Sequence, residues 1–420
     1  MTRNPFNGLP WQEKLTFGAL CLSVAAVVLW WRLGVIAIML LVVASLVKLI
    51  STRRIGNPSL DRLQRICLWA MVAYWILYAV SAIVSTDHAE GWSTAGIKLY
   101  FFLLPLLCLC NDTNYLTRHR IRSLFQVLTA TLLLRFIVCL AVSGIQYLKG
   151  VPLAELRDWQ MDPLGLHHNY LALYLVTALA FLYTQFVERD KSTRQRRLLL
   201  LIPAAAALVA YLFMSASRSG ILTIGLLAIA CLVHLTFVRK RWKTGLCITL
   251  FSIGLLAGAY WAVPSTFSRF TTPLQNRDAN HVADEREILW ECGLKTAKRS
   301  LLFGYGSGDY MPPLLESYTQ RGYHKAVRET LGTHNQYLET ILETGLVGAA
   351  MLLFMLFTPF VASLRKNRRT LLVPLAILAM TSQMAFESML NRQMGAQFIA
   401  IVYCLLVLSL ASRKEKAIAS

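Results

Sequence analysis

Charged residues are scarce in this sequence. Of its 420 residues, 15% are Asp, Glu, Lys or Arg and 56% are hydrophobic, and the mean hydropathy is +0.51. Soluble domains average about 25% charged and about 45–50% apolar residues. Apolar runs of about 17–25 residues, each long enough to cross a bilayer, recur along the chain. The composition therefore excludes an ordinary soluble domain and indicates an all-α integral membrane protein.

The cysteine and carboxylate motifs of common metal sites are also missing. Of nine cysteines, only Cys292 lies away from the apolar runs, and the chain contains no C-x-x-C. This excludes a structural disulfide in the polar part of the chain and a zinc site of that pattern. No D-x-D is present, the carboxylate pair with which many nucleotide-sugar enzymes hold a metal ion. We therefore expect no metal and no cofactor.

Hydropathy predicts about twelve membrane spans. They cover 15–31, 33–50, 64–85, 95–110, 123–147, 168–187, 198–216, 219–238, 244–264, 336–364, 370–388 and 393–411. No small-x-small cleavage site follows the first span, so we interpret it as a retained helix rather than a signal peptide. The chain then divides into nine spans over 1–264, a long loop over 265–335, and three spans with a tail over 336–420.

Lys and Arg divide unequally between the two sides of these spans. With the N-terminus inside, the inner segments hold 26 of the 42 basic residues and the short outer connections hold six. Basic residues favour the cytoplasmic side of a membrane. We therefore expect both termini in the cytoplasm and 265–335 outside. The net charge of +20 is then a topology signal that also suits anionic lipids, and we expect no nucleic-acid partner.

The loop 265–335 is the one large departure from short connections, and loops of this length are usually functional or form a small domain. Its stretch 284–300, DEREILWECGLKTAKRS, is typical of a short amphipathic helix with Arg286 in the first turn. A glycine-rich turn, LLFGYGSGDY, follows over 301–310. Its G-x-G-x-G spacing and its context differ from those of a nucleotide-binding loop, which favours a plain turn between helices.

Polar side chains mark several span ends on the expected outer side. Asp87 follows the third span, and His168 begins the sixth. Arg218 is the one charged residue between the seventh and eighth spans. The membrane interface selects polar residues at helix ends even where no site exists. Asp87 and His168 are therefore open to a structural or a supporting role, and Arg218 to a role as membrane anchor or anion contact.

His334 is the most informative of these span-end residues. It follows a glycine at the start of the tenth span, where Thr333 or Asn335 already supplies a helix cap. An imidazole with a reference pKa near 6.5 exchanges protons at neutral pH, as a general base must. Asn335 and Tyr337 are candidate supporting residues beside it.

Two carboxylates, Glu339 and Glu343, lie inside the tenth span. Carboxylates within a membrane span usually face protein or water. Four residues apart, they share one helix face, pointing away from His334 in a regular helix. We favour pairing with basic groups of neighbouring spans or of the loop, such as Arg321 and Arg328. The alternative is that Glu339 orients the site from below.

Four stretches together resemble the O-antigen ligase and polymerase superfamily. They are SASRSG (215–220), EREILWECGLKTAKRSLLFGYGSGDY (285–310), THNQYLETILETGLVG (333–348) and, upstream, VSTDHAEGW (84–92). No single stretch is distinctive, but their order, the span count and the place of the long loop agree with the superfamily. The chain length favours the ligase branch.

The resemblance implies an inverting, metal-independent membrane glycosyltransferase of the bacterial inner membrane. Such a ligase moves O-antigen polysaccharide from undecaprenyl pyrophosphate to a lipid A core sugar at the periplasmic face, in lipopolysaccharide biosynthesis. It implies His334 as the catalytic base and Arg218 and Arg286 as pyrophosphate contacts. Guanidinium groups suit that task because they present paired donors to phosphate oxygens and stay charged.

Two other functions remain open from the sequence. A repeat-unit polymerase would use the same donor, although its usual two long outer loops are not both present. A secondary transporter would show inverted repeats and broken helices. Spans six and ten begin with HNYL and HNQYL, but no longer repeat accompanies these residues.

Overall fold

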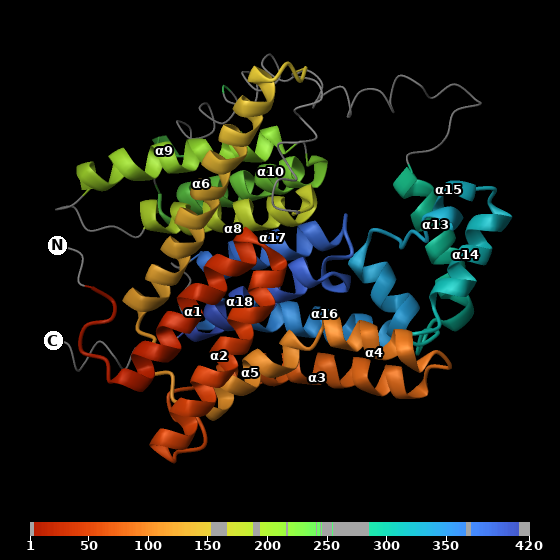
Figure 1. Ribbon diagram of the computed structural model, residues 1–420, viewed down its shortest axis with the longest axis horizontal. Helices are drawn as coiled ribbons and strands as arrows, with labels where there is room; N and C mark the ends of the chain where they lie inside the picture. Colours follow the sequence, from red (N-terminus) through yellow and green to blue (C-terminus); the bar gives the residue numbers. More distant parts are fainter. Residues whose placement is uncertain are drawn as a thin grey trace. The chain divides into compact units, whose positions relative to one another are not determined.

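The computed structural model describes six main stretches of the chain. These are residues 4–152, 166–187, 194–215, 217–240, 285–366 and 371–410, together with 242, 243, 245 and 254. All regular elements within these residues are helices (Figure 1). The predicted all-α architecture is therefore confirmed for this part of the protein.

Seven helices are long and apolar enough to cross a membrane. They are α1 (Trp11–Leu29), α2 (Trp31–Thr52), α3 (Arg62–Val84), α6 (Arg118–Leu148), α8 (His168–Val187), α10 (Arg218–Val233, continued by the π-helical turn η2, His234–Val238) and α16 (Gln336–Lys366). The bent pair α4 (His88–Ile97) and α5 (Tyr100–Cys110) would make an eighth. Shorter apolar helical stretches are Leu198–Met214 within α9 (Arg194–Met214), α17 (Leu372–Met384) and α18 (Gln393–Ser409).

The protein is thus a multi-pass integral membrane protein with seven or eight candidate spans among the described residues. The count of twelve stays a prediction, and the ninth predicted span, 244–264, lies largely outside the described residues. The fourth predicted span, 95–110, differs from the structure: α4 and α5 meet at an angle of 47°. Hydropathy averaged over a window does not register such a bend, because both halves are apolar.

The chain forms two compact units. The first contains Met1–Thr131, Leu289–Arg368 and Met384–Ser420, and the second contains Leu132–Ile288 and Arg369–Gln383. The division into a first set of spans, a loop and a last set of spans stays a prediction. Each unit joins segments that are distant in the sequence.

Helix α3 of the first unit packs against α4, α5 and α16. Asp61 starts it with a capping box: its side chain accepts from the Gln64 backbone N–H, and the Gln64 side chain accepts from the Asp61 N–H. The Gln64 amide also donates to the Val407 carbonyl of α18 at 2.9 Å. Such side-chain links replace water as partners for polar groups between spans.

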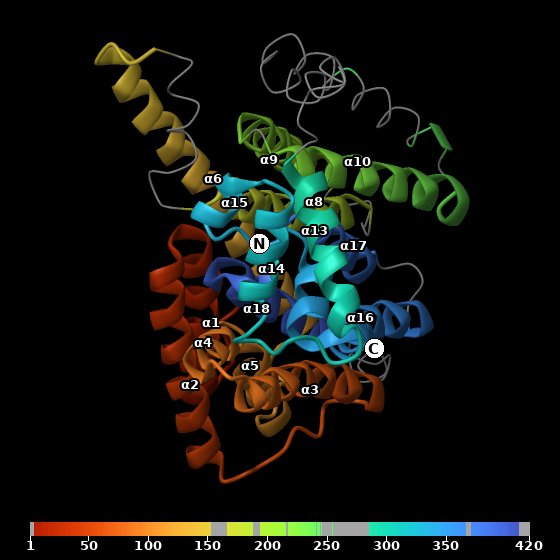
Figure 2. The ribbon, with the colours of Figure 1, turned by 90° about the vertical axis from the view of Figure 1, so that its right-hand side faces the viewer.

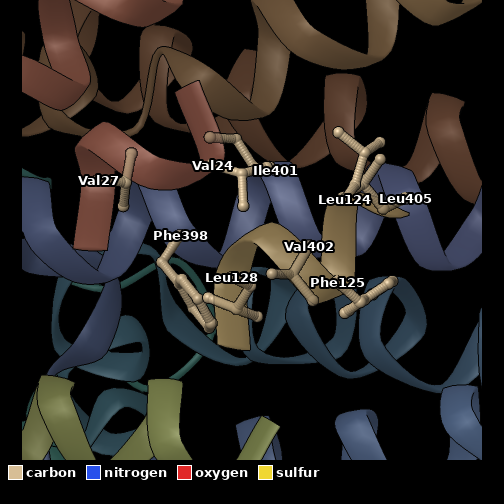
Figure 3. A pocket seen from close by; sticks show the side chains of 9 residues that line it. All are labelled: Val24, Val27, Leu124, Phe125, Leu128, Phe398, Ile401, Val402 and Leu405. Carbon is tan, nitrogen blue, oxygen red and sulfur yellow. The ribbon is translucent and has the colours of Figure 1, made fainter. Parts of the chain in front are cut away.

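One small cavity lies in the apolar interior of this unit. A cavity of about 10 Å³ lies among side chains of α1, α6 and α18, including Val24, Leu128 and Phe398 (Figure 3). That volume is the space of about one water molecule, and the walls are apolar. This cavity is therefore a packing defect and not a substrate site.

Helix α16 is broken near its start. Gly345 has a φ of 67°, a left-handed conformation that interrupts the helix. The glycine-rich turn that precedes the tenth predicted span fills the break with its own backbone. Tyr305 N–H donates to the Leu342 carbonyl at 2.8 Å, and Leu346 N–H donates to the Leu301 carbonyl at 2.9 Å. The turn and the span therefore form one structural piece, with their exposed backbone groups paired as a membrane requires.

The described end of the long loop folds into short helices. These are α13 (Glu285–Ala297), η3 (Lys298–Ser300), α14 (Met311–Gln320) and α15 (His324–Arg328), which lie close together (Figures 1 and 2) and belong to the first unit from Leu289 onward. Two prolines in its first turn start α14, where no backbone N–H is needed. The helix predicted over 284–300 is confirmed for Glu285–Ala297.

Candidate functional site

The His334 segment is held in a strained backbone. His334 has a φ of 48°, in the left-handed region that side chains other than glycine seldom occupy. Asn335 then starts α16, because its side-chain oxygen accepts from the N–H groups of Tyr337 (3.0 Å) and Leu338 (3.2 Å). The cap predicted at this position is therefore Asn335, and His334 is not needed for capping. Strain of this kind gathers at functional sites.

His334 contacts a carboxylate from a distant part of the chain. Its Nδ1 lies 2.9 Å from Oε1 of Glu387, and the two side chains are 37% and 8% exposed. Oε1 also accepts from the Ser388 N–H at 3.2 Å. With Glu387 ionised, the Nδ1 proton points at the carboxylate and Nε2 carries the lone pair. A carboxylate that fixes the tautomer in this way is how histidine bases are commonly oriented.

Glu339 supports the His334 segment from within α16. Its Oε2 accepts from the Thr333 N–H (2.9 Å) and hydroxyl (2.6 Å), and its Oε1 accepts from the Tyr310 hydroxyl at 2.9 Å. Gly332 lies so close that an added Cβ would come 2.6 Å from Oε1. Burial, followed by the charge of Glu339, raises the pKa of Tyr310 well above its usual value, so the hydroxyl stays a donor.

These bonds bear on the question left by the two carboxylates. Glu339 binds the N–H and hydroxyl of Thr333, directly before His334, and the Tyr310 hydroxyl at the end of the glycine-rich turn. That Glu339 orients the site stays a prediction. The pairing suggested for Arg321 is wrong, because its guanidinium lies on Glu291 at 3.2 Å. Glu291 belongs to α13, and its exposed carboxylate is the ion-pair partner of Arg321.

Glu343 takes the other predicted role, pairing with a basic group. Its carboxylate lies 3.8 Å from the ammonium of Lys98, and both side chains are fully buried. Asn391 links the pair, since its amide donates to Glu343 (2.8 Å) while its oxygen accepts from Lys98 (2.8 Å). The Tyr78 hydroxyl donates to the same carboxylate at 2.5 Å. This network ties together α3, the α4–α5 bend, α16 and the start of α18.

Helix α13 packs against the His334 segment. Gly293 makes this approach possible: an added Cβ there would come 2.7 Å from Leu338 and 2.9 Å from Thr333. Arg286 lies in the first turn of the same 13-residue helix, half-buried. Backbone N–H groups and the helix dipole make such a turn favourable for an anion. The predicted position of Arg286 at a helix start is confirmed.

Arg218 stands at a second helix start, in the second unit. It is the first residue of α10, whose N-cap Ser217 accepts from the Gly220 N–H through its side chain. The Ser217 and Ser219 hydroxyls both donate to the side-chain oxygen of Asn169, at 3.1 and 3.2 Å. Asn169 directly follows His168 at the start of α8. The structure therefore brings the predicted Arg218 turn and the start of the sixth predicted span together.

The other predicted supporting residues have local roles. Asp87 caps α4 by accepting from the Glu90 N–H at 3.0 Å, and its own N–H donates to Asp309 at 2.8 Å. The His168 ring packs on the His167 ring, with centroids 4.0 Å apart. Tyr337 is half-buried in the first turn of α16. Within the described residues, no three or more His, Cys, Asp or Glu side chains group as metal ligands.

The comparisons with known proteins bear on the segments just described. Residues 203–353 match the family model described as O-antigen ligase. This confirms the resemblance drawn from the motifs, and the matched range contains Arg218, Arg286 and His334. The match extends over part of the chain and shows similarity to the O-antigen ligase family within that range. No curated protein matches the chain.

Two residues of these networks were missed from the sequence. Glu387 lies at the end of the predicted span 370–388, where an acidic side chain in an apolar run was a signal of a partner. Lys98 is one of the six basic residues of the short outer connections, and its side chain is fully buried. In both cases the partner lies more than 50 residues away, so no local pattern names it.

Proposed function

We propose that this protein is a ligase that transfers O-antigen polysaccharide from undecaprenyl pyrophosphate to a lipid A core sugar. The observation that carries the proposal is the contact between His334 and the buried Glu387, inside a chain whose residues 203–353 match the O-antigen ligase family. Both termini are cytoplasmic and the reaction takes place at the periplasmic face of the inner membrane. The basic residues gathered in the inner segments support this orientation.

His334 acts as the general base in this reaction. Nε2 accepts the proton of the acceptor hydroxyl as that oxygen attacks the anomeric carbon of the donor sugar. A new carbon–oxygen bond forms, the bond to the pyrophosphate oxygen breaks, and the electron pair leaves with undecaprenyl pyrophosphate. A single displacement of this kind inverts the anomeric configuration. General-base catalysis contributes roughly 10²–10⁴-fold to such a step.

Arg218 and Arg286 hold the donor pyrophosphate. Each lies in the first turn of a helix, where N–H groups and the helix dipole add to the guanidinium charge. Two arginines can neutralise the negative charge that grows on the leaving group, which is commonly the larger catalytic contribution. The chain therefore has a chemical means of stabilising this leaving group through side chains alone.

The most direct experiment uses the purified full-length protein. It is mixed with an undecaprenyl-pyrophosphate glycan and lipid A core, with a chelator present, and the products are separated by size. A glycan attached to lipid A core supports the proposal. A longer lipid-linked glycan without lipid A core would instead identify a repeat-unit polymerase, the other activity of the matched family. Movement of the intact donor across a vesicle membrane with no new glycosidic bond would favour a transporter.

A further inference from the structure

A groove on the first unit lies between α3 and α16, away from the His334 segment. Its volume is about 600 Å³, within the range of small-molecule sites. Arg62 and Arg65 line one end, and Trp69, Met351 and Phe354 line the rest. The groove is therefore charged at one end and apolar along its length.

The groove follows one face of α3. Its lining residues on this helix run from Arg62 to Ala73 at spacings of three and four, so they form a single stripe. Eleven residues of helix rise about 17 Å, which is close to half the roughly 30 Å hydrocarbon thickness of a bilayer. The lining includes the small side chains of Ala70 and Ala73, and Trp69 and Phe354 are 53% and 52% exposed.

The charge at the mouth of the groove is positive. Arg62 and Arg65 are both exposed, and one guanidinium nitrogen of Arg65 donates to the Asn57 carbonyl at 3.2 Å. The nearest carboxylate along the chain, Asp61, forms an ion pair with Lys366. Its charge is thereby offset, and the two arginines face the surroundings as cations.

We propose that this groove binds an anionic glycerophospholipid of the surrounding leaflet. The headgroup phosphate pairs with Arg62 and Arg65, and one acyl chain lies along Trp69, Ala73 and Phe354. The groove is about as long as half of the hydrocarbon core. This length matches the acyl chain of a lipid in one leaflet and is too short for a helix that spans both leaflets. The arginines favour an anionic headgroup, because clustered basic residues beside a membrane gain from negative lipids. The inference does not depend on the enzyme's proposed reaction.

Native mass spectrometry of the purified protein in detergent tests this inference. Phosphatidylglycerol and phosphatidylcholine with identical acyl chains are titrated separately, and the lipid-bound fraction is measured. Each arginine contributes about fivefold, so Arg62→Gln with Arg65→Gln should weaken phosphatidylglycerol binding about 25-fold. Phosphatidylcholine carries the same phosphate, but its choline cation offsets the charge, so its binding should weaken less. Ala73→Phe leaves every charge in place but fills the groove, so it should weaken binding of both lipids.

The matched control removes the same charge from the neighbouring loop. Arg53→Gln with Arg54→Gln changes two exposed arginines that do not line the groove, and it should leave both affinities within about twofold. Equal binding of the two lipids by the unchanged protein would overturn the proposal. So would an equal loss in the control variant, or full binding by Ala73→Phe. Binding of undecaprenyl phosphate without binding of phosphatidylglycerol would assign the groove to a different lipid and also contradict it.

Discussion

Replacing Glu387 with Gln should slow glycan transfer about 10- to 150-fold while donor binding stays intact. The change keeps the size of the side chain and removes its charge. A hydrogen bond to a charged group contributes about 1.5–3 kcal/mol, and about 1.4 kcal/mol corresponds to a tenfold change in rate. Because the Glu387 side chain is 8% exposed and 2.9 Å from the imidazole, water screens this interaction little.

The loss follows from the tautomer of His334. An amide at position 387 can donate its own N–H to Nδ1, which moves the ring proton to Nε2 and removes the lone pair that a base needs. The assay is single-turnover transfer with saturating donor, followed from low to high pH. The unchanged enzyme should slow as the pH falls, because a protonated imidazole has no lone pair with which to accept the hydroxyl proton. In Glu387→Gln this acid limb should move to lower pH, because a neutral amide stabilises the protonated ring less than a carboxylate does.

A double-mutant cycle separates this role from simple stabilisation. If Glu387 acts through the ring, adding Glu387→Gln to His334→Ala should cost nothing further in rate. Glu316→Gln, an exposed carboxylate of α14, is the control and should transfer at the unchanged rate. A wild-type rate for Glu387→Gln, or fully additive losses in the cycle, would refute the reasoning.

Three further predictions follow from the same contacts. Arg218→Lys and Arg286→Lys keep the charge but lose the paired donors, so each should lose most activity and bind donor more weakly in a direct binding assay. Gly345→Ala should lower the stability of the purified protein by about 1–3 kcal/mol in a thermal melt, because φ is 67° and an added Cβ would clash with the Leu302 carbonyl. Lys98→Met should destabilise by about 3–5 kcal/mol by leaving the buried carboxylate of its partner in α16 unpaired.

Each of these predictions has a matched control in the chain. Arg54→Lys, in the loop after α2, should leave transfer unchanged. Gly225→Ala adds a Cβ in α10 where no atom lies within 4 Å, so it should not destabilise. Lys295→Met changes an exposed lysine of α13 and should melt like the unchanged protein. If a control fell as far as its paired variant, the contact named for that pair would not be the cause.

Hydropathy predicted most of the helices because burial in lipid imposes long apolar runs that need no tertiary information. The starts of α1, α2, α3, α8 and α18 lie within about four residues of the predicted span starts. The break at Gly345 was not predicted, since GLVG in an apolar run also suits a continuous helix. The break depends on the turn around Leu301 and Tyr305, whose backbone fills it. Backbone hydrogen bonds between two segments that are distant in the sequence produce no periodic pattern in the sequence of either segment.

The residues of the candidate site were predicted unevenly for a similar reason. His334 and its neighbouring cap Asn335 form a local pattern, so residue type and spacing were enough to single them out. Glu387 lies 53 positions further along and belongs to another helix connection. Its role depends on a fold that brings the two segments together, which single-sequence reasoning does not supply. The sequence offered one clue to Glu387, namely an acidic residue near the end of an apolar span.

The central claim is that His334 performs the chemistry and does not hold the donor. The measurement that tests it most directly compares His334→Ala with the unchanged protein in one preparation, recording donor affinity and single-turnover transfer together. The account predicts donor affinity within about twofold and a transfer rate lower by roughly 10²–10⁴-fold. Full transfer by the variant, or loss of transfer that matches an equal loss of donor affinity, would contradict it.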